Sequence, residues 1–211
     1  MDFIFFGMQG AGKGTLGKAV AEKFNMQIFE TGGELRKLAQ EDSELGKKIK
    51  SIIEAGHLVS DEVVMEIVEN FMNHLEPGTF VLFDGIPRKV KQGEMLIDLL
   101  NKHNRNYKAV LIDITQEEAL KRLTTRRICS KCKTVYPADY KNETCEKDGA
   151  ELITRADDNS DAIKTRLNNY QTETVPAIEL FADKLIKIDG LPPILEVRED
   201  AIRKLTPIIN N

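Results

Sequence analysis

Short apolar runs alternate along this chain with longer stretches in which apolar residues recur every three or four positions. The runs predict buried strands, because strands covered on both faces are almost continuously apolar, and they lie at 2–6, 27–30, 79–84, 107–113 and 184–189. The periodic stretches predict helices at 13–24, 33–55 with a break near 42, 61–74, 89–103 and 116–126. This alternation predicts a three-layer α/β domain, in which helices flank a parallel five-stranded sheet.

Two stretches do not fit one compact sheet. Residues 31–73 read as helix after helix without a strand, and residues 127–158 are rich in charge, cysteine and turn residues. We interpret both as insertions above the carboxyl ends of the strands, where such sheets bind ligands. The predicted organisation is a core formed by 1–30, 74–126 and 159–211, with a helical insertion at 31–73 and a lid at 127–158.

Composition narrows the class of protein. The chain has 211 residues, of which 41% are hydrophobic and 30% charged, as expected for a soluble protein with one sizeable core. The opening apolar run is only four residues long and follows Asp2, which is unlike a secretory signal. No apolar run approaches the roughly 18 residues of a membrane span. Three clustered cysteines favour thiolates kept reduced for a metal. We expect a cytoplasmic monomer without membrane contacts.

Charge is unevenly distributed along the chain. The net charge of −4 gives no sign of general affinity for nucleic acid. Residues 121–155, however, contain nine Lys or Arg against five Asp or Glu, which is +4 locally and leaves −8 on the rest. This distribution indicates an anionic small ligand near that segment.

The stretch FFGMQGAGKGT follows the first predicted strand and precedes the first helix. Its glycines allow a tight turn that presents backbone N–H groups to phosphate oxygens, and the helix adds its positive dipole end. Lys13 supplies a full positive charge. The G-x-x-x-x-G-K spacing is typical of a phosphate-binding P-loop, although Gly14 follows the lysine and the hydroxyl comes one place later, at Thr15.

GAGKGT, together with TGGELR (31–36), FDGIPR (83–88), LTTRRIC (123–129) and TRADD (154–158), resembles the adenylate kinase family in order and spacing over nearly the whole chain. The resemblance implies a P-loop NTPase-type core that reversibly transfers the γ-phosphoryl group of ATP to AMP, giving ADP, with Mg²⁺. It also implies that 31–73 is the family's monophosphate-binding domain and 127–158 its long lid. Gly33 stands where the family commonly has an aspartate.

The resemblance assigns roles residue by residue. The group expected to act on the phosphates in catalysis is Lys13, Asp84, Arg88, Arg122, Arg126, Arg155 and Arg166. ATP is expected on Gly10, Ala11, Gly12, Lys13, Gly14, Thr15, Arg122, Arg126 and Gly190. AMP is expected on Thr31, Arg36, Val59, Gly85, Arg88, Gln92, Arg155 and Arg166. Arginines suit this task because phosphoryl transfer depends on holding two phosphate chains in line and cancelling their repulsion.

Three acidic residues have two readings. Asp84 resembles the carboxylate that orients Mg²⁺ through water, or it caps the turn that follows its strand. Asp157 and Asp158 resemble a hinge pair that orients arginines or the Mg²⁺ shell, or they form an acidic N-cap for a helix beginning near Asn159.

The cysteines predict a metal site in the lid. Cys129 and Cys132 form C-x-x-C, Cys145 follows after twelve residues, and Asp148 stands where a second C-x-x-C would end. A carboxylate carries the same charge as a thiolate and also binds zinc, and the set resembles one variant of the zinc-bearing adenylate kinase lid. We predict structural Zn²⁺ on Cys129, Cys132, Cys145 and Asp148. The alternative is a lid without metal, held by hydrogen bonds.

Two other functions share some of these features. A UMP/CMP or guanylate-type kinase would have the same phosphate loop and arginines, but Gln92 and the long lid argue against it. A zinc ribbon that binds nucleic acid would need stacking aromatic residues and a basic stripe, and the segment offers only Tyr136 and Tyr140. We therefore expect ATP, AMP and ADP as ligands and no nucleic acid.

Overall fold

The structure, a computed structural model, describes residues 1–137 and 140–209. The strands are β1 Asp2–Phe6, β2 Gln27–Glu30, β3 Val81–Asp84, β4 Tyr107–Asp113, β5 Arg127–Cys129, β6 Val135–Tyr136, β7 Leu152–Ile153 and β8 Leu185–Asp189. The α-helices are α1 Lys13–Phe24, α2 Thr31–Leu38, α3 Glu44–Glu54, α4 Asp61–Asn73, α5 Val90–Lys102, α6 Gln116–Thr125, α7 Ser160–Asn169, α8 Val175–Glu179 and α9 Ile194–Ile209. A π-helical turn at Tyr170–Thr174 joins α7 to α8.

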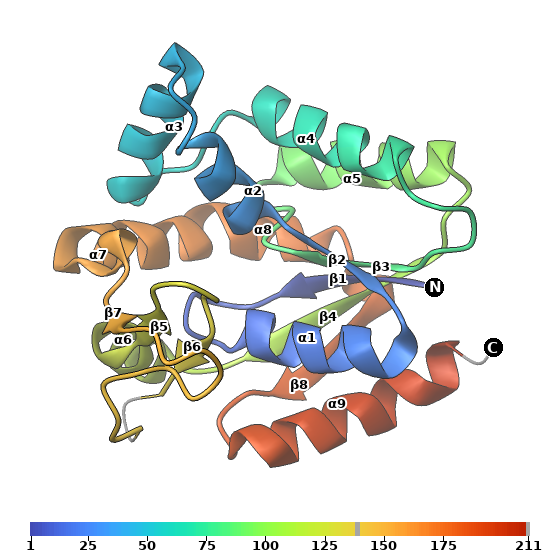
Figure 1. Ribbon diagram of the computed structural model, residues 1–211. Helices are drawn as coiled ribbons and strands as arrows, with labels where there is room; N and C mark the ends of the chain where they lie inside the picture. The colour runs from blue at the N-terminus through green and yellow to red at the C-terminus, as the bar shows by residue number, and fades with distance from the viewer. Residues whose placement is uncertain (138–139, 210–211) are drawn as a thin grey trace.

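A parallel five-stranded sheet in the order β2-β3-β1-β4-β8 forms the centre of the molecule. All five residues of β1 are buried, because the strand pairs with β3 and β4 and helices cover both faces of the sheet. In Figure 1, α1 crosses in front of the sheet, α9 lies below β8, and α7 and α8 lie above β1. The predicted three-layer α/β fold is confirmed.

Most predicted elements end within two residues of the observed ones. The predicted break near 42 is confirmed, since α2 ends at Leu38 and α3 begins at Glu44. Ser43 caps α3 by accepting a hydrogen bond from the Gly46 N–H at 2.9 Å. Residues 31–73 contain α2, α3 and α4, at the top of Figure 1.

The lid segment has a small sheet and a core of its own. Strands β5, β6 and β7 pair antiparallel in the order β6-β5-β7. One buried residue from each strand packs together with Cys145; the four residues of this core are Cys129, Tyr136, Cys145 and Leu152. A core of this size is too small to hold the segment by hydrophobic burial alone, so other bonds must stabilise it.

A buried ion pair ties the start of β1 to its neighbours. Asp2 is 1% exposed, and its Oδ1 accepts hydrogen bonds from the Val81 N–H at 2.9 Å and from Arg105 Nη2 at 2.7 Å. Arg105 also donates to the carbonyl oxygen of Thr79 at 2.6 Å. The pair therefore joins the first strand to the chain segments that enter β3 and β4. None of the helices in the described part of the chain combines the length and apolar character that a membrane crossing requires.

Candidate functional site

The loop between β1 and α1 has the geometry of a phosphate cradle. Gly7 has φ 150, and a Cβ there would lie 2.6 Å from the carbonyl oxygen of Ile112. Gly12 precedes α1 with φ 93, in the left-handed region that favours glycine. Gly12, Gly14 and Thr15 are exposed, and the first turn of a helix leaves N–H groups without intrahelical acceptors. These N–H groups can therefore bind an anion.

Lys13 folds back over this loop. Its Nζ donates to the carbonyl oxygens of Gly7 at 2.7 Å and Met8 at 3.2 Å. The side chain as a whole is half-buried, but desolvation of the ammonium group lowers the pKa of Lys13 to about 8. The charge of Asp84 opposes that shift, and burial in turn raises the pKa of Asp84. Asp84 also lies close to the loop, since its Oδ2 is 3.7 Å from where a Cβ of Gly14 would be.

A second corner of the site gathers three of the residues expected to bind AMP. Arg88 Nε donates to the carbonyl oxygen of Gly85 at 3.0 Å. Gly85 has φ 85, and a Cβ there would lie 3.2 Å from Arg88 Nη2 and 3.5 Å from Thr31 Cβ. The hydroxyl oxygen of Thr31 is buried and makes no hydrogen bond to the described residues. This hydroxyl therefore has unused hydrogen-bonding capacity at this corner of the site.

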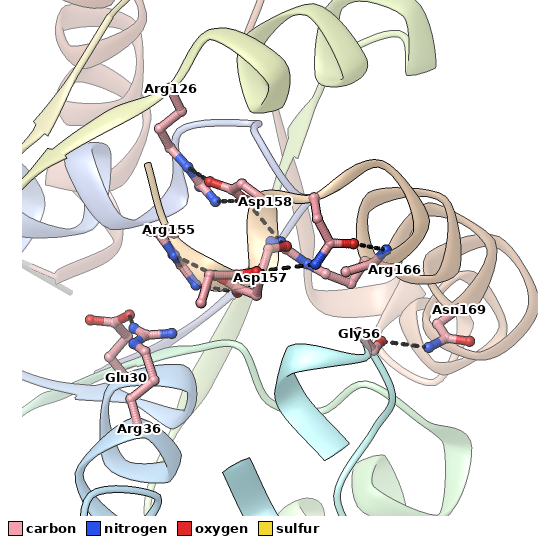
Figure 2. Close-up of polar contacts among 12 residues, drawn as sticks. Glu30, Arg36, Gly56, Arg126, Arg155, Asp157, Asp158, Arg166 and Asn169 are labelled. Carbon is pink, nitrogen blue, oxygen red and sulfur yellow. Dashed lines mark hydrogen bonds and ion pairs between the residues drawn. The ribbon is translucent and has the colours of Figure 1, made fainter. Parts of the chain in front are cut away.

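Carboxylates hold four of the site's arginines, as Figure 2 shows. Arg126 binds Asp158 through two hydrogen bonds, of 2.8 Å from Nε and 2.5 Å from Nη2. Arg155 binds Asp157 in the same two-pronged way. Arg166 Nη1 donates to Asp158 Oδ1 at 3.0 Å and to the Asp157 carbonyl oxygen at 2.8 Å.

Arg36 is the fourth of these arginines. Its Nη2 donates to Glu30 Oε1 at 2.8 Å (Figure 2).

These arginines converge on one place. Desolvation lowers the pKa of Arg88, and the charges of Arg166, Arg36 and Arg155 lower it further. Desolvation also lowers the pKa of Arg166, and the charges of Arg155 and Arg126 lower it further. Arg126 and Arg166 both bind Asp158. Arg155 and Arg166 both reach Asp157, so these guanidinium groups lie close together. Their mutual repulsion favours an anionic ligand with several charges.

Asp157 and Asp158 orient arginines and do not cap the following helix. The N-cap of α7 is Asn159, whose Oδ1 accepts a hydrogen bond from the Ala162 N–H at 2.9 Å. The alternative prediction, in which Asp157 or Asp158 forms an acidic N-cap of this helix, is therefore wrong.

Arg122 joins the two parts of the chain expected to bind ATP. It extends from α6, where Nε donates to Glu118 Oε1 at 2.7 Å. Its Nη2 donates to the carbonyl oxygen of Gly190 at 2.9 Å, and Nη1 lies 3.5 Å from that of Gly10. The phosphate loop and the loop after β8 thus lie on either side of one guanidinium group.

Two residues expected to contact AMP are enclosed by protein. Val59 is 6% exposed and belongs to the main hydrophobic core. Gln92 is 2% exposed, and its side-chain oxygen accepts a hydrogen bond from the Arg88 N–H at 2.8 Å. Its side-chain nitrogen donates to Asp61 Oδ1 at 2.9 Å.

The lid brings together the four predicted zinc ligands. One sulfur or oxygen atom from each of Cys129, Cys132, Cys145 and Asp148 lies within 4.8 Å of the others. The Lys131 and Cys132 N–H groups donate to Cys129 Sγ at 3.3 and 3.2 Å. Lys133 and Gly149 end the two turns with φ 57 and φ 70. Three sulfurs and one carboxylate in this arrangement fit tetrahedral zinc, without an open position for a substrate.

Tyr136 supports one of these ligands. It is 3% exposed, and its hydroxyl donates to Cys145 Sγ at 3.1 Å while accepting from the Glu146 N–H at 3.1 Å. Partners of this kind fix the orientation of metal ligands.

Comparison with known proteins agrees with this geometry. The sequence model of the family described as "Adenylate kinase" matches residues 5–186. The chain belongs to the adenylate kinase family. Adenylate kinases of Staphylococcus aureus and Staphylococcus epidermidis are each 36% identical to it over 209 residues, which cover 96% of this chain and 97% of the relative. The P-loop, the arginines and the lid of this adenylate kinase family member all lie within the matched residues.

Sequence reasoning missed two residues that make contacts around this site, Glu30 and Asn169. Glu30 ends β2 at the carboxyl edge of the sheet, and that position is a signal that could have identified it. Asn169 Nδ2 donates to the carbonyl oxygen of Gly56 at 3.2 Å, which links α7 to the helical insertion (Figure 2). Nothing in the local sequence of either residue indicates that contact.

Proposed function

We propose that this protein transfers the γ-phosphoryl group of ATP to AMP, reversibly, and so produces two molecules of ADP. Membership of the adenylate kinase family and the names of its relatives support adenine nucleotides as substrates. We further propose that it acts as a monomer in the cytoplasm, where the reducing environment would keep the three free cysteines of the metal-type cluster as thiols.

One observation carries the proposal: cationic side chains from separate parts of the chain converge near Lys13 and Arg88. Arg36 comes from α2, Arg126 from the end of α6 and Arg166 from α7, and their charges act on the pKa of Lys13, of Arg88 or of both. A P-loop alone binds one phosphate chain. Cations that surround it suit a reaction between two phosphate chains, where repulsion must be cancelled.

In this proposal, the ATP phosphates bind residues 10–15 and Arg122, and the adenine lies near Gly190. The AMP phosphate binds Arg36 and Arg88, and its base lies near Thr31, Val59, Gly85 and Gln92. Arg126, Arg155 and Arg166 close on the transferring group. These residues position the reactants and exclude water, which is most of the catalysis that phosphoryl transfer requires.

Two metals have places in the proposal. Mg²⁺ bound with ATP would neutralise part of the phosphate charge, and Asp84 would orient it through water. Structural Zn²⁺ would be held by Cys129, Cys132, Cys145 and Asp148, where it would stabilise a lid whose own core is small.

A coupled assay with ATP, Mg²⁺ and each of AMP, UMP, CMP and GMP tests the proposal. We expect a clear preference for AMP; a preference for another monophosphate would overturn it. Arg88→Ala should lower kcat/KM. The loss should correspond to roughly several kcal/mol of transition-state stabilisation, as expected when a group that holds a phosphate is removed. Arg198→Ala is the matched control, because Arg198 is an exposed arginine on α9.

A further inference from the structure

Gln92 lies between two partners that differ in hydrogen-bonding capacity. Its side-chain oxygen accepts from the Arg88 N–H at 2.8 Å, and a backbone N–H can only donate. Its side-chain nitrogen donates to Asp61 Oδ1 at 2.9 Å, and an ionised carboxylate can only accept. The two partners come from different places, since Arg88 lies before α5 and Asp61 is the first residue of α4.

These partners fix the direction of the carboxamide. If the amide turned over, its NH₂ group would face the Arg88 N–H and its oxygen would face the Asp61 carboxylate. Both contacts would be repulsive. Gln92 is only 2% exposed and the Asp61 side chain only 13% exposed, so water cannot compensate for the lost hydrogen bonds.

The fixed direction of the Gln92 carboxamide determines which purine bases it can hydrogen-bond. An amide oxygen accepts two hydrogen bonds and an amide nitrogen donates two, so beyond these contacts one lone pair and one N–H remain. Adenine presents the N6–H donor beside a ring-nitrogen acceptor, and glutamine matches that pair with both ends of its amide. A 6-oxo purine presents an acceptor at the same position. A freely turning amide would adapt to either base, whereas a fixed one cannot.

We infer that Asp61 is a positioning residue that sets the polarity of the Gln92 carboxamide and thereby selects a 6-amino purine monophosphate over a 6-oxo one. This inference rests on the proposed function, in which Gln92 contacts the base of AMP. It adds a residue that need not touch the nucleotide, because Asp61 acts through Gln92.

A purely structural role for Asp61 would be a contact between two helices. Its carboxylate also forms an ion pair with Lys89 at 3.1 Å, and α4 packs against α5. The neighbouring Glu62 makes such a contact alone: its Oε1 binds Lys91 Nζ at 2.8 Å. Glu62→Gln is therefore a matched control, with the analogous acid-to-amide change one residue away and no hydrogen bond to Gln92 among the described residues. Lys89→Gln controls for the Asp61 ion pair.

The test is the ratio of kcat/KM for AMP to kcat/KM for IMP, with saturating ATP and Mg²⁺. These monophosphates differ in the base only at position 6, where an amino group becomes an oxo group, and at N1, which carries a proton in the 6-oxo base. In Asp61→Asn the new NH₂ group can donate to a turned Gln92 oxygen, so only the Arg88 N–H still opposes the turned amide. We expect the ratio to fall about tenfold. Glu62→Gln and Lys89→Gln should keep it within about twofold. A ratio from one preparation does not depend on its folded fraction, and Asp61→Ser should shift it in the same direction.

The inference is overturned if Asp61→Asn keeps the wild-type ratio, or if Glu62→Gln lowers it as much. Gln92→Ala separates this failure from failure of the proposed function. If Gln92→Ala abolishes the discrimination and Asp61→Asn keeps the wild-type ratio, only the inference fails. If Gln92→Ala leaves the ratio unchanged, the base-reading role of Gln92 fails and the inference fails with it.

Discussion

Arg36 donates a hydrogen bond to Glu30 across 2.8 Å, so a guanidinium group proposed to bind the AMP phosphate is paired with a carboxylate of the protein itself. The contact also occupies space above Gly33, because Glu30 Oε2 lies 3.4 Å from where a Cβ of Gly33 would be. The family's common aspartate at that position would crowd this carboxylate. Glu30 thus supplies a negative charge close to the place where Gly33 lacks one.

Glu30→Gln should strengthen AMP binding, because the phosphate then displaces a neutral amide from Arg36. The Glu30 side chain is 48% exposed, and pairs of this kind contribute about 0.5–1 kcal/mol. We expect the KM for AMP to fall about two- to fivefold, with the KM for ATP unchanged. Glu34→Gln, which loses an exposed ion pair to Lys37 on the same helix, is the control. An unchanged or higher KM for AMP in Glu30→Gln would show that the Glu30 carboxylate does not compete with the AMP phosphate for Arg36.

Lys13 predicts a pH dependence of nucleotide binding. Desolvation lowers its pKa to about 8, so the free enzyme should lose this positive charge as the pH rises through about 8. We expect kcat/KM for ATP, which reports the free enzyme, to fall above that pH, and a flat profile to pH 10 would contradict it. The titration of Lys13 would not itself destabilise the fold in this range. A lowered lysine pKa makes this group's contribution to stability increase with pH between about 8 and 10.5, because the unfolded chain there binds more protons.

The lid should lose zinc when a ligand or its support is removed. Protein purified without chelators should contain close to one zinc per chain, and Asp148→Ala should retain it far more weakly. Tyr136→Phe, which removes the hydrogen bond to Cys145 Sγ, should lower zinc affinity about tenfold. Competition with a coloured chelator measures both effects. Tyr140→Phe is the control, since the Tyr140 hydroxyl donates to the Thr144 carbonyl oxygen at 3.1 Å. Equal zinc affinity in all these variants would exclude the proposed ligand set.

Arg105→Met should destabilise the core, because it leaves the Asp2 carboxylate, 1% exposed, without its cationic partner. Breaking a buried pair costs about 3–5 kcal/mol, which in a chain of this size corresponds to a thermal midpoint lower by roughly 6 °C or more. Arg203→Met breaks a more exposed pair with Asp200 on α9 and should change the midpoint by little. Similar midpoints for both variants would show that the buried pair does not stabilise the core.

The sequence predicts those strands and helices that are long enough to show an apolar run or a helical period among neighbouring residues. After Asp2, β1 is continuously apolar because helices cover both of its faces, so its sequence alone predicts a buried strand. The alternation of apolar runs and helices along the chain is enough to predict the parallel sheet. The lid strands, of two or three residues, are too short to show a period. A helix beginning near Asn159, which is α7, is expected from the sequence, but neither α8 nor α9 is predicted. A π-helical turn interrupts the period after α7, Pro176 begins α8, and Pro207 lies inside α9.

The same distinction applies to the site. Lys13 and the cysteine cluster follow from spacing, because their residues are near neighbours in the chain. The pairs Arg36–Glu30 and Gln92–Asp61 depend on which side chains the packing brings together. An acidic residue in the first turn, such as Asp61, stabilises any helix, so its contact with Gln92 has no local sequence signal.

Transfer of a labelled phosphoryl group tests the central claim most directly. The purified protein is incubated with Mg²⁺, AMP and ATP labelled in the γ-phosphate, and the nucleotides are separated over time. The proposal predicts that label leaves ATP and appears in newly formed ADP, with two ADP formed for each AMP consumed and little inorganic phosphate, because the closed site excludes water. Label that remains in ATP, or that appears mainly as inorganic phosphate, would contradict it.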